Sequence, residues 1–240
     1  MFMVGAASPF VERTPLSLMR RALAMLGMAM MLAACDSRDA GSVGTEAIPQ
    51  GKGYDFYVLS LSWSPTHCQM ASATANAQQC GSRQTHGFVV HGLWPQFEKG
   101  WPEFCDSREP KRVPEALLRD NLDIMPSESL IGHQWRKHGS CSGLSQAEYF
   151  SVVRAAYEKI VVPSAYEETS IALDTSPDKV EQEFLAANPD LPADGIAVIC
   201  KERYVSEARI CLTKDLKFRS CPQVDARACQ RRGATLPASN

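Results

Sequence analysis

Two histidines and a lysine lie within six residues of one another in the segment Ile131–Cys141. If the segment forms a short helix, residues four positions apart share a face. His133 then lies beside Lys137. Gln134 lies beside His138 in the same way. Such a face suits an anionic substrate whose reaction needs proton transfer, because imidazole gains and loses a proton near neutral pH.

One more histidine, His91, ends an apolar run in the segment Val89–Gln96. A polar helix face on its own is most often simply solvated, so a second segment with its own histidine strengthens the case for a catalytic site. Two histidines can divide proton transfer between them, because a neutral imidazole removes a proton while an imidazolium supplies one. A nearby ammonium group can stabilise the negative charge that develops during the reaction.

Together, the two segments closely resemble the active-site segments of the ribonuclease T2 family, the base-nonspecific secreted ribonucleases. The first family segment is matched residue for residue by His91–Pro95. The second is matched, with His133 also in place, by Trp135, Lys137, His138, Gly139 and Cys141. The segments occur in the family order, with about forty residues between them. Each segment alone is suggestive, but the pair is specific.

The resemblance implies a role for each of these side chains. His138 would be the general base and His91 the general acid, while Lys137 would stabilise the pentacovalent transition state. His133 would bind phosphate. RNA brings its own nucleophile, the 2′-hydroxyl beside the scissile phosphate, so the implied reaction needs neither a metal nor another cofactor. It leaves a 2′,3′-cyclic phosphate, and DNA, which lacks the hydroxyl, should not be cleaved.

Trp94 and Gln96 follow His91 closely and are candidates for binding a base of single-stranded RNA. Stacking a base on an aromatic ring contributes roughly 1–3 kcal/mol whatever the base, which agrees with the low base specificity that the resemblance implies. An ordinary core tryptophan is the alternative interpretation of Trp94. His67 and His86 lie outside both segments, and we interpret them as structural.

Gln134 departs from the family pattern, which usually has Glu at this position. An amide can still hydrogen-bond phosphate or ribose, but it carries no negative charge. A catalytically weak or silent lipoprotein that binds RNA or nucleotides is therefore an alternative function. A metallohydrolase is a poorer alternative, because its helical motif places histidines four apart with a glutamate between them. His133 and His138 are five apart.

Residues 1–35 have the pattern of a bacterial lipoprotein signal peptide. Three arginines precede an apolar run, Ala22–Ala34, that is too short to span a membrane. Small residues precede Cys35, which we expect to be lipidated, although an ordinary signal peptide with an incidental Cys35 is an alternative. We expect export to the bacterial periplasm or cell envelope, with a lipid anchor in the membrane. Residues 36–52 would form a flexible tether, and residues 53–240 the catalytic domain.

Nine cysteines are an odd number for an exported chain, and setting Cys35 aside leaves eight. Eight cysteines allow four disulfides, which suits an oxidising compartment. A zinc site is disfavoured because no CxxC pair occurs. The resemblance implies Cys68–Cys80, Cys105–Cys141 and a nested set among the last four. The eight residues are Cys68, Cys80, Cys105, Cys141, Cys200, Cys211, Cys221 and Cys229.

The formal net charge is −2, and it falls to about −4 without residues 1–35, which carry three basic residues and one acidic residue. A broadly basic nucleic-acid-binding protein is therefore excluded. Any contact with RNA must come from a local basic site. We expect the protein to be a monomer.

Apolar strands and amphipathic helices must position these residues. Ser145 and Glu148 form a capping box, followed by apolar residues at helical spacing. Ser176 and Pro177 are typical of another helix start. We expect a single α+β domain whose central, largely antiparallel sheet is packed with helices and stapled by disulfides, and the resemblance implies the same fold over most of residues 54–221. The expected strands are 54–63, 87–94 and two or three within 196–221; the expected loops are 68–85 and 97–112; a further helix is expected at 114–122.

Overall fold

The computed structural model describes residues 47–71, 75–81, 85–167 and 169–239, all of which belong to one compact unit. The predicted signal peptide, Cys35 and most of the predicted tether lie outside the described residues. No helix within the described ranges is both long enough and apolar enough to cross a membrane.

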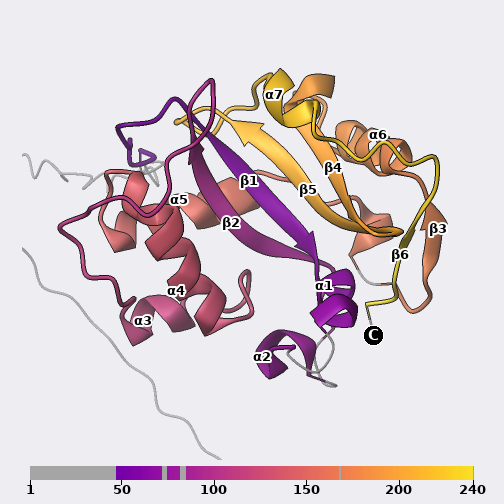
Figure 1. Cartoon of the computed structure of the whole chain (residues 1–240), viewed down its shortest axis with the longest axis horizontal. Helices are drawn as coiled ribbons and strands as arrows, with labels where there is room; N and C mark the ends of the chain where they lie inside the picture. The colour runs from indigo at the N-terminus through magenta and orange to yellow at the C-terminus, as the bar shows by residue number, and fades with distance from the viewer. Residues whose placement is uncertain (1–46, 72–74, 82–84, 168, 240) are drawn as a thin grey trace, which may run out of the picture. The chain divides into compact units, whose positions relative to one another are not determined.

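A six-stranded sheet forms the centre of the described part of the chain (Figure 1). Its strand order is β2-β1-β5-β6-β3, and β4 also pairs with β5. All of these pairings are antiparallel except the one between β5 and β6. The predicted α+β class with a largely antiparallel sheet is therefore confirmed. The strands are β1 (Phe56–Trp63), β2 (Phe88–Gln96), β3 (Leu173–Thr175), β4 (Ile196–Lys201), β5 (Tyr204–Leu212) and β6 (Ala234–Leu236).

The two faces of the sheet carry different side chains, because successive residues of a strand point to opposite faces. On β1, Tyr57 and Leu59 enter the main hydrophobic core, whereas Phe56 and Val58 belong to a smaller apolar cluster. The partly buried Trp94 of β2 packs against this smaller cluster. The candidate site therefore lies on the face of the sheet that carries the smaller cluster.

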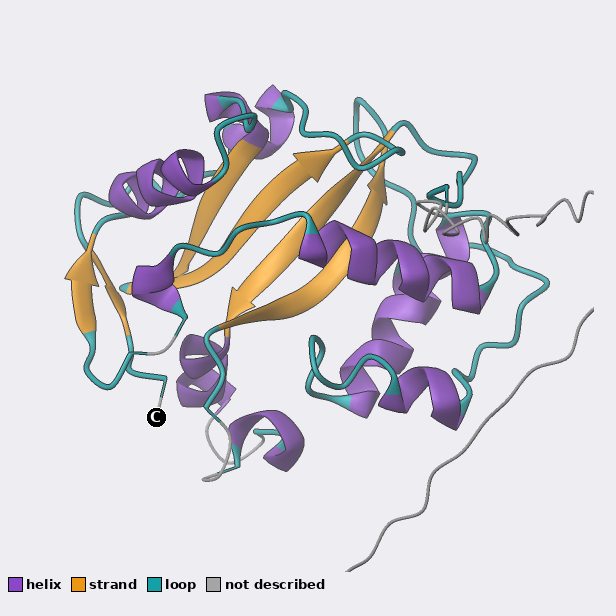
Figure 2. Cartoon of the chain, turned by 180° about the vertical axis from the view of Figure 1, so that it is seen from behind, coloured by secondary structure: helices purple, strands orange, loops and turns teal. Residues whose placement is uncertain are grey.

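Helices cover the sheet and supply the second histidine segment. α4 packs against β2, α5 packs against β1 and β2, and α6 packs against β4 (Figure 2). The predicted capping box is confirmed, because the Ser145 and Glu148 side chains each accept a bond from the other's backbone N–H. The helices are α1 (Ser64–Ala71), α2 (Ala77–Cys80), α3 (Glu115–Arg119), α4 (Glu128–Lys137), α5 (Gln146–Glu158), α6 (Pro177–Ala187) and α7 (Pro222–Asp225).

The expected loop at 68–85 is wrong for much of its length, because α1 and α2 occupy it. Its small polar composition gives no periodic signal, and helices this short are marginal by themselves. Two local features stabilise them instead. The Asn76 side chain accepts a hydrogen bond from Gln78 N and caps α2, and the Cys68–Cys80 disulfide joins the two helices.

Other boundaries also differ from expectation. The helix expected at 114–122 ends at Arg119, and β2 continues through Pro95 to Gln96 because it is an edge strand that pairs only with β1. β3 and β6 were not expected at all. Each has three residues, which is too short to show the alternation that marks a strand.

Four disulfides join the eight cysteines of the described ranges, with the pairing that the family resemblance implies. The last two are nested, since one loop lies inside the other. The bridges are Cys68–Cys80, Cys105–Cys141, Cys200–Cys229 and Cys211–Cys221.

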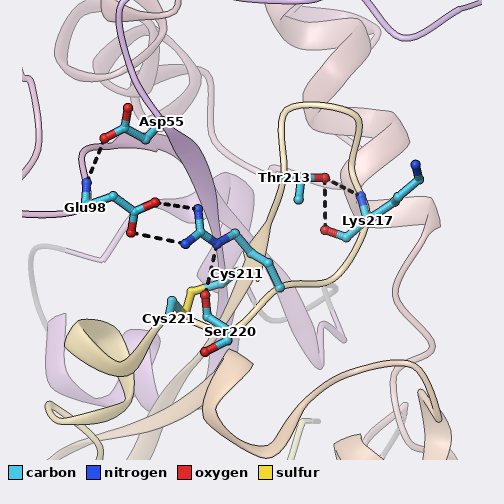
Figure 3. Close-up of polar contacts among 8 residues, drawn as sticks. Asp55, Glu98, Cys211, Thr213, Lys217, Ser220 and Cys221 are labelled. Carbon is cyan, nitrogen blue, oxygen red and sulfur yellow. Dashed lines mark hydrogen bonds and ion pairs between the residues drawn. A yellow bond between two sulfur atoms is a disulfide. The ribbon is translucent and has the colours of Figure 1, made fainter.

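The segment after β5 is fixed to the loop after β2 (Figure 3). The Arg219 guanidinium donates to both carboxylate oxygens of Glu98, at 3.0 and 3.1 Å. Glu98 N in turn donates to Asp55 Oδ2 at 2.8 Å. Together with Cys211–Cys221, these contacts hold the chain that leads into α7 near the end of β2.

Candidate active site

Helix α4 carries most of the second histidine segment. Its last residue is Lys137, and His138 is the C-cap, whose backbone N–H donates to Gln134 O at 2.9 Å. Trp135 is buried and donates its indole N–H to Pro110 O at 2.8 Å. This tryptophan anchors the end of α4 in the core, on a different face of the helix from the residues that line the site.

Gly139 is required by close packing. A Cβ atom there would collide with the rings of Trp135 and Tyr149. The backbone of Gly139 does not adopt a positive φ, so the usual conformational reason for a glycine after a helix does not apply. The glycine instead lets the turn that follows α4 pack directly on the rings of the core.

His91 lies at a β-bulge in β2. Gly92 pairs with Ser60 and Val90 pairs with Leu61, so His91 is the extra residue in the register between β1 and β2. A bulge bends a strand locally and redirects a side chain. The bulge therefore sets the direction in which the His91 side chain points.

A cavity of about 260 Å³ contains all seven predicted catalytic and substrate-binding side chains, which come from β2 and from the end of α4. Five further residues complete its wall. The predicted residues are His91, Trp94, Gln96, His133, Gln134, Lys137 and His138, and the additional ones are Val58, Trp101, Arg209, Val224 and Arg227.

Trp94 connects the other groups of the cavity. Its ring stacks on His138 with centroids 5.3 Å apart and meets His91 edge-on at 5.4 Å. The Arg209 guanidinium lies over the same ring at 5.2 Å, and the indole N–H donates to Gln134 Oε1 at 2.9 Å. Trp94 therefore holds both histidine rings.

Gln134 is buried, with 2% of its surface exposed. Its side-chain oxygen is already bonded to Trp94, and Gly92 leaves room for this bond, since a Cβ at that position would collide with both partners. The amide at position 134 thus aligns Trp94, in addition to lining the cavity.

His138 is held in its neutral form. Burial, followed by the charge of Lys137 and by His91 and His133, lowers the pKa of His138 to about 3. Its Nδ1 is buried and has no hydrogen-bond partner among the described residues. This imidazole is therefore uncharged at all but strongly acidic pH.

His91 has the opposite environment. Its Nδ1 lies 2.9 Å from Glu207 Oε1, and Glu207 is also bonded to Arg209. Burial alone would raise the pKa of Glu207, but the contacts with His91 and Arg209 outweigh it and lower the pKa to about 2. Glu207 is therefore a carboxylate across the whole physiological range and can accept a hydrogen bond from the Nδ1–H of His91.

The sequence model of the ribonuclease T2 family matches residues 54–221. The chain belongs to the ribonuclease T2 family.

Individual relatives agree with this assignment. A ribonuclease from Aeromonas hydrophila is 35% identical over 185 residues, which cover 69% of this chain and 77% of the relative. A probable ribonuclease from Haemophilus influenzae is 37% identical over 122 residues, or 46% of this chain and 44% of the relative. The solved RNase-related protein from Calystegia sepium has a TM-score of 0.63 and 26% identity, and covers 79% of this chain and 100% of its own. The chain is thus a T2-type ribonuclease.

In this T2-type ribonuclease, the loop between β2 and α3 is fastened to the turn that follows α4. Phe104 N donates to Lys137 O at 2.8 Å, and Cys105 is joined to Cys141. Lys137 Nζ lies 3.6 Å from Glu103 Oε2 and 6.0 Å from the centre of the Phe104 ring. The loop therefore helps to orient the lysine.

His133 is exposed at the rim of the cavity. Partial burial, together with the positive charges of Lys137 and Arg136 and with His91, lowers its pKa. Its ring meets Phe104 edge-on at 6.4 Å.

Four polar or aromatic residues of the site do not follow from the two family segments. Glu207 and Arg209 alternate on the buried strand β5, and two charges at this spacing inside an apolar strand are a signal that sequence inspection can use. Trp101 and Arg227 face each other across the cavity rim, with the guanidinium 5.0 Å from the ring. Arg227 lies beyond residue 221, where the family match ends, so no family pattern points to it.

Among the described residues, no group of three histidine, cysteine or acidic side chains is arranged to hold a metal ion. The eight cysteines in these ranges are all paired in disulfides.

Proposed function

We propose that this T2-type ribonuclease cleaves single-stranded RNA internally, by metal-independent transphosphorylation and with low base specificity. The observation that carries this proposal is the contrast between its two histidines, which line one cavity in opposite electrostatic environments. A site of this kind holds a base and an acid at the same pH.

In the proposed reaction, neutral His138 removes the proton of the ribose 2′-hydroxyl, and the 2′-oxygen bonds to phosphorus. The bond from phosphorus to the 5′-oxygen breaks, and protonated His91 supplies a proton to that oxygen. Lys137 stabilises the charge on the non-bridging oxygens in the transition state. The products are a 2′,3′-cyclic phosphate end and a free 5′-hydroxyl end.

The surrounding side chains have supporting roles in this proposal. His133, which lies exposed at the rim, binds a phosphate of the strand. Trp94 and Gln96 contact a base, and Gln134 fixes the plane of the Trp94 ring through its hydrogen bond. Contacts to a ring face accept any base, which fits low base specificity.

A silent RNA-binding protein is the second candidate, because Gln134 replaces the family's usual glutamate. One experiment separates the candidates: incubation of the purified protein with an RNA oligonucleotide in EDTA, with products identified by mass spectrometry. Cyclic phosphate ends in EDTA are expected. Cleavage that disappears in EDTA would mean metal-dependent catalysis, and binding without cleavage would mean a silent protein. A matched oligonucleotide with one 2′-deoxyribose should survive at that position.

We also propose that Cys35 carries the lipid anchor of a bacterial envelope protein and that the protein acts there as a monomer. The support is the sequence pattern of residues 1–35, and the pairing of the eight cysteines of the described ranges. The variant Cys35→Ser should leave the detergent phase for the aqueous phase. Mass spectrometry of the mature N-terminus decides the matter, because an unmodified chain that starts elsewhere contradicts the proposal.

A further inference from the structure

We propose that Glu207 is a positioning residue for His91, and that Arg209 holds Glu207 in place. The inference rests on the proposed function, since it assigns the group that prepares the general acid. Neither residue belongs to the two histidine segments; both lie on β5.

The Glu207 carboxylate divides its two oxygens between two partners. Oε1 lies 2.9 Å from His91 Nδ1. Oε2 accepts from Arg209 Nε at 2.8 Å and lies 2.7 Å from Nη2. Because the Glu207 side chain is only 14% exposed, water competes little for these bonds. The carboxylate is therefore fixed at both ends.

The sheet makes this contact possible across an intervening strand. β1 lies between β2, which carries His91, and β5, which carries Glu207. Where β5 crosses β1, Glu207 pairs with Ser62 and Arg209 pairs with Ser60. Serine side chains are short, so they leave space above β1 for the longer side chains to meet. The bulge at His91 shifts its register on the other side of β1.

The contact determines how the His91 ring is used. A carboxylate at Nδ1 accepts a hydrogen bond from the N–H of that nitrogen, so the other proton of the imidazolium is carried by Nε2. Nε2 is then the atom that can donate to a leaving oxygen.

Every other charged or titratable group lining the cavities beside His91 is basic. His91 and Glu207 also line a neighbouring cavity of about 320 Å³. Within the described ranges, Glu207 is the single carboxylate among these basic groups of the two cavities, and it contacts His91 directly. Those groups are His67 on α1, Lys201 on β4, Arg209 on β5, His133 and Lys137 on α4, the C-cap His138, and Arg227 after α7.

The test is the substitution Glu207→Gln, which keeps the shape of the side chain and removes its charge. The pH dependence of kcat/KM for dinucleotide cleavage should change on its basic limb, where the acid must stay protonated. We expect that limb to move down by about one pH unit, and kcat/KM above neutral pH to fall about 10- to 100-fold. Glu207→Asp, which retains the charge, should return the basic limb part of the way to its position in the unaltered protein.

Histidine NMR titration of the free protein gives a second readout that needs no turnover. The midpoint of the His91 signals should move to lower pH in Glu207→Gln. The control is Glu98→Gln, which removes another carboxylate bonded to an arginine (Figure 3) but does not line the cavity. It should leave both the midpoint and the rate profile unchanged.

A double variant distinguishes the failure of this inference from the failure of the proposed function. If Glu207 acts through His91, adding Glu207→Gln to His91→Ala should cause no further loss. If His91→Ala is inactive but Glu207→Gln is fully active and its His91 titration is unchanged, only the positioning role is overturned. Near-normal activity of His91→Ala would overturn the proposed function itself.

Discussion

Trp94 contacts both histidine rings of the cavity, and the two rings differ in what surrounds them. His138 is buried next to Lys137, whereas His91 contacts the carboxylate of Glu207. One tryptophan thus contacts both a buried neutral imidazole and an imidazole bonded to a carboxylate. At the residue scale, the site depends on this difference between two chemically identical side chains.

Removing either histidine should therefore abolish most of the turnover. We expect His91→Ala and His138→Ala each to lower kcat by about 10²–10⁴, the usual contribution of one general acid or base. His86→Ala, which removes an imidazole that does not line the cavity, is the matched control and should remain active. Circular dichroism must show that each variant is folded. Near-normal turnover in either folded catalytic variant would refute its assigned role.

The acidic limb of the rate profile should lie at unusually low pH. A general base must be neutral to act, and burial among positive groups lowers the pKa of His138 to about 3. The base is thus available well below pH 6.5, where an ordinary imidazole becomes protonated. The measurement is kcat/KM from pH 3 to 8 for a dinucleotide substrate whose own titration is corrected for. An acidic limb near 6.5 would show that His138 is not the group that limits the rate in acid.

Residue types and spacing suffice to identify the seven predicted side chains that share the cavity. All seven lie in or directly beside the two family segments, so a local pattern is enough to find them. They do not identify contacts made over long range. Nothing near Gln134 in the sequence indicates that its oxygen is bonded to Trp94, forty positions away. Glu207 is 116 positions from His91, so only the folded sheet brings them together.

At the scale of the elements, the catalytic turn at the end of α4 is held from two sides. Gly139 lets the turn pack on the rings of Trp135 and Tyr149, and Cys105–Cys141 joins it to the loop at Phe104. The loop and the turn should therefore behave as one unit.

Breaking that link should reduce activity by more than its effect on stability explains. We expect the double variant Cys105→Ser/Cys141→Ser to lose about 2–4 kcal/mol of stability and 10- to about 100-fold in kcat, because small displacements of catalytic groups are costly. Cys68→Ser/Cys80→Ser is the control, since it opens a bridge between α1 and α2 outside the cavity. Both variants are compared by denaturant unfolding and by kcat at a temperature where each is folded. Equal kcat losses would contradict a special role for the turn.

The elements that sequence analysis identifies are those with a long periodic or capping signal. α5 is found for this reason, whereas β1 is found from its continuous apolar run. α1 and α2 are missed because a disulfide and an asparagine cap stabilise them, and β3 and β6 because short strands form only when their partners are present.

At the scale of the whole molecule, a chain of net charge −2 places three permanently charged cationic side chains around the candidate site. Lys137, Arg209 and Arg227 all line it. A net charge that is not positive limits nonspecific binding of nucleic acid, while the cationic side chains of the cavity attract a phosphate chain locally. Binding should consequently be sensitive to salt.

Arg227 provides the test of this charge distribution, because it lies outside the matched family region. We expect Arg227→Ala to raise KM for an oligonucleotide several-fold at low salt, with little change in kcat. The slope of log(1/KM) against log salt should decrease by about one, as expected for the loss of one phosphate contact. Arg232→Ala, an exposed arginine that does not line the cavity, should leave the slope unchanged. An unaltered slope in Arg227→Ala would mean that this arginine serves only to pack against Trp101.

The link between Cys105 and Cys141 also bears on the safety of the cell that makes this enzyme. A ribonuclease threatens the transcripts from which it is translated. The bond that clamps its catalytic turn forms only under oxidising conditions, whereas cytosolic thiols are kept reduced. If the chain is exported as proposed, it would be least active in the cytosol, where its own messenger RNA is translated, and fully active only once this disulfide has formed.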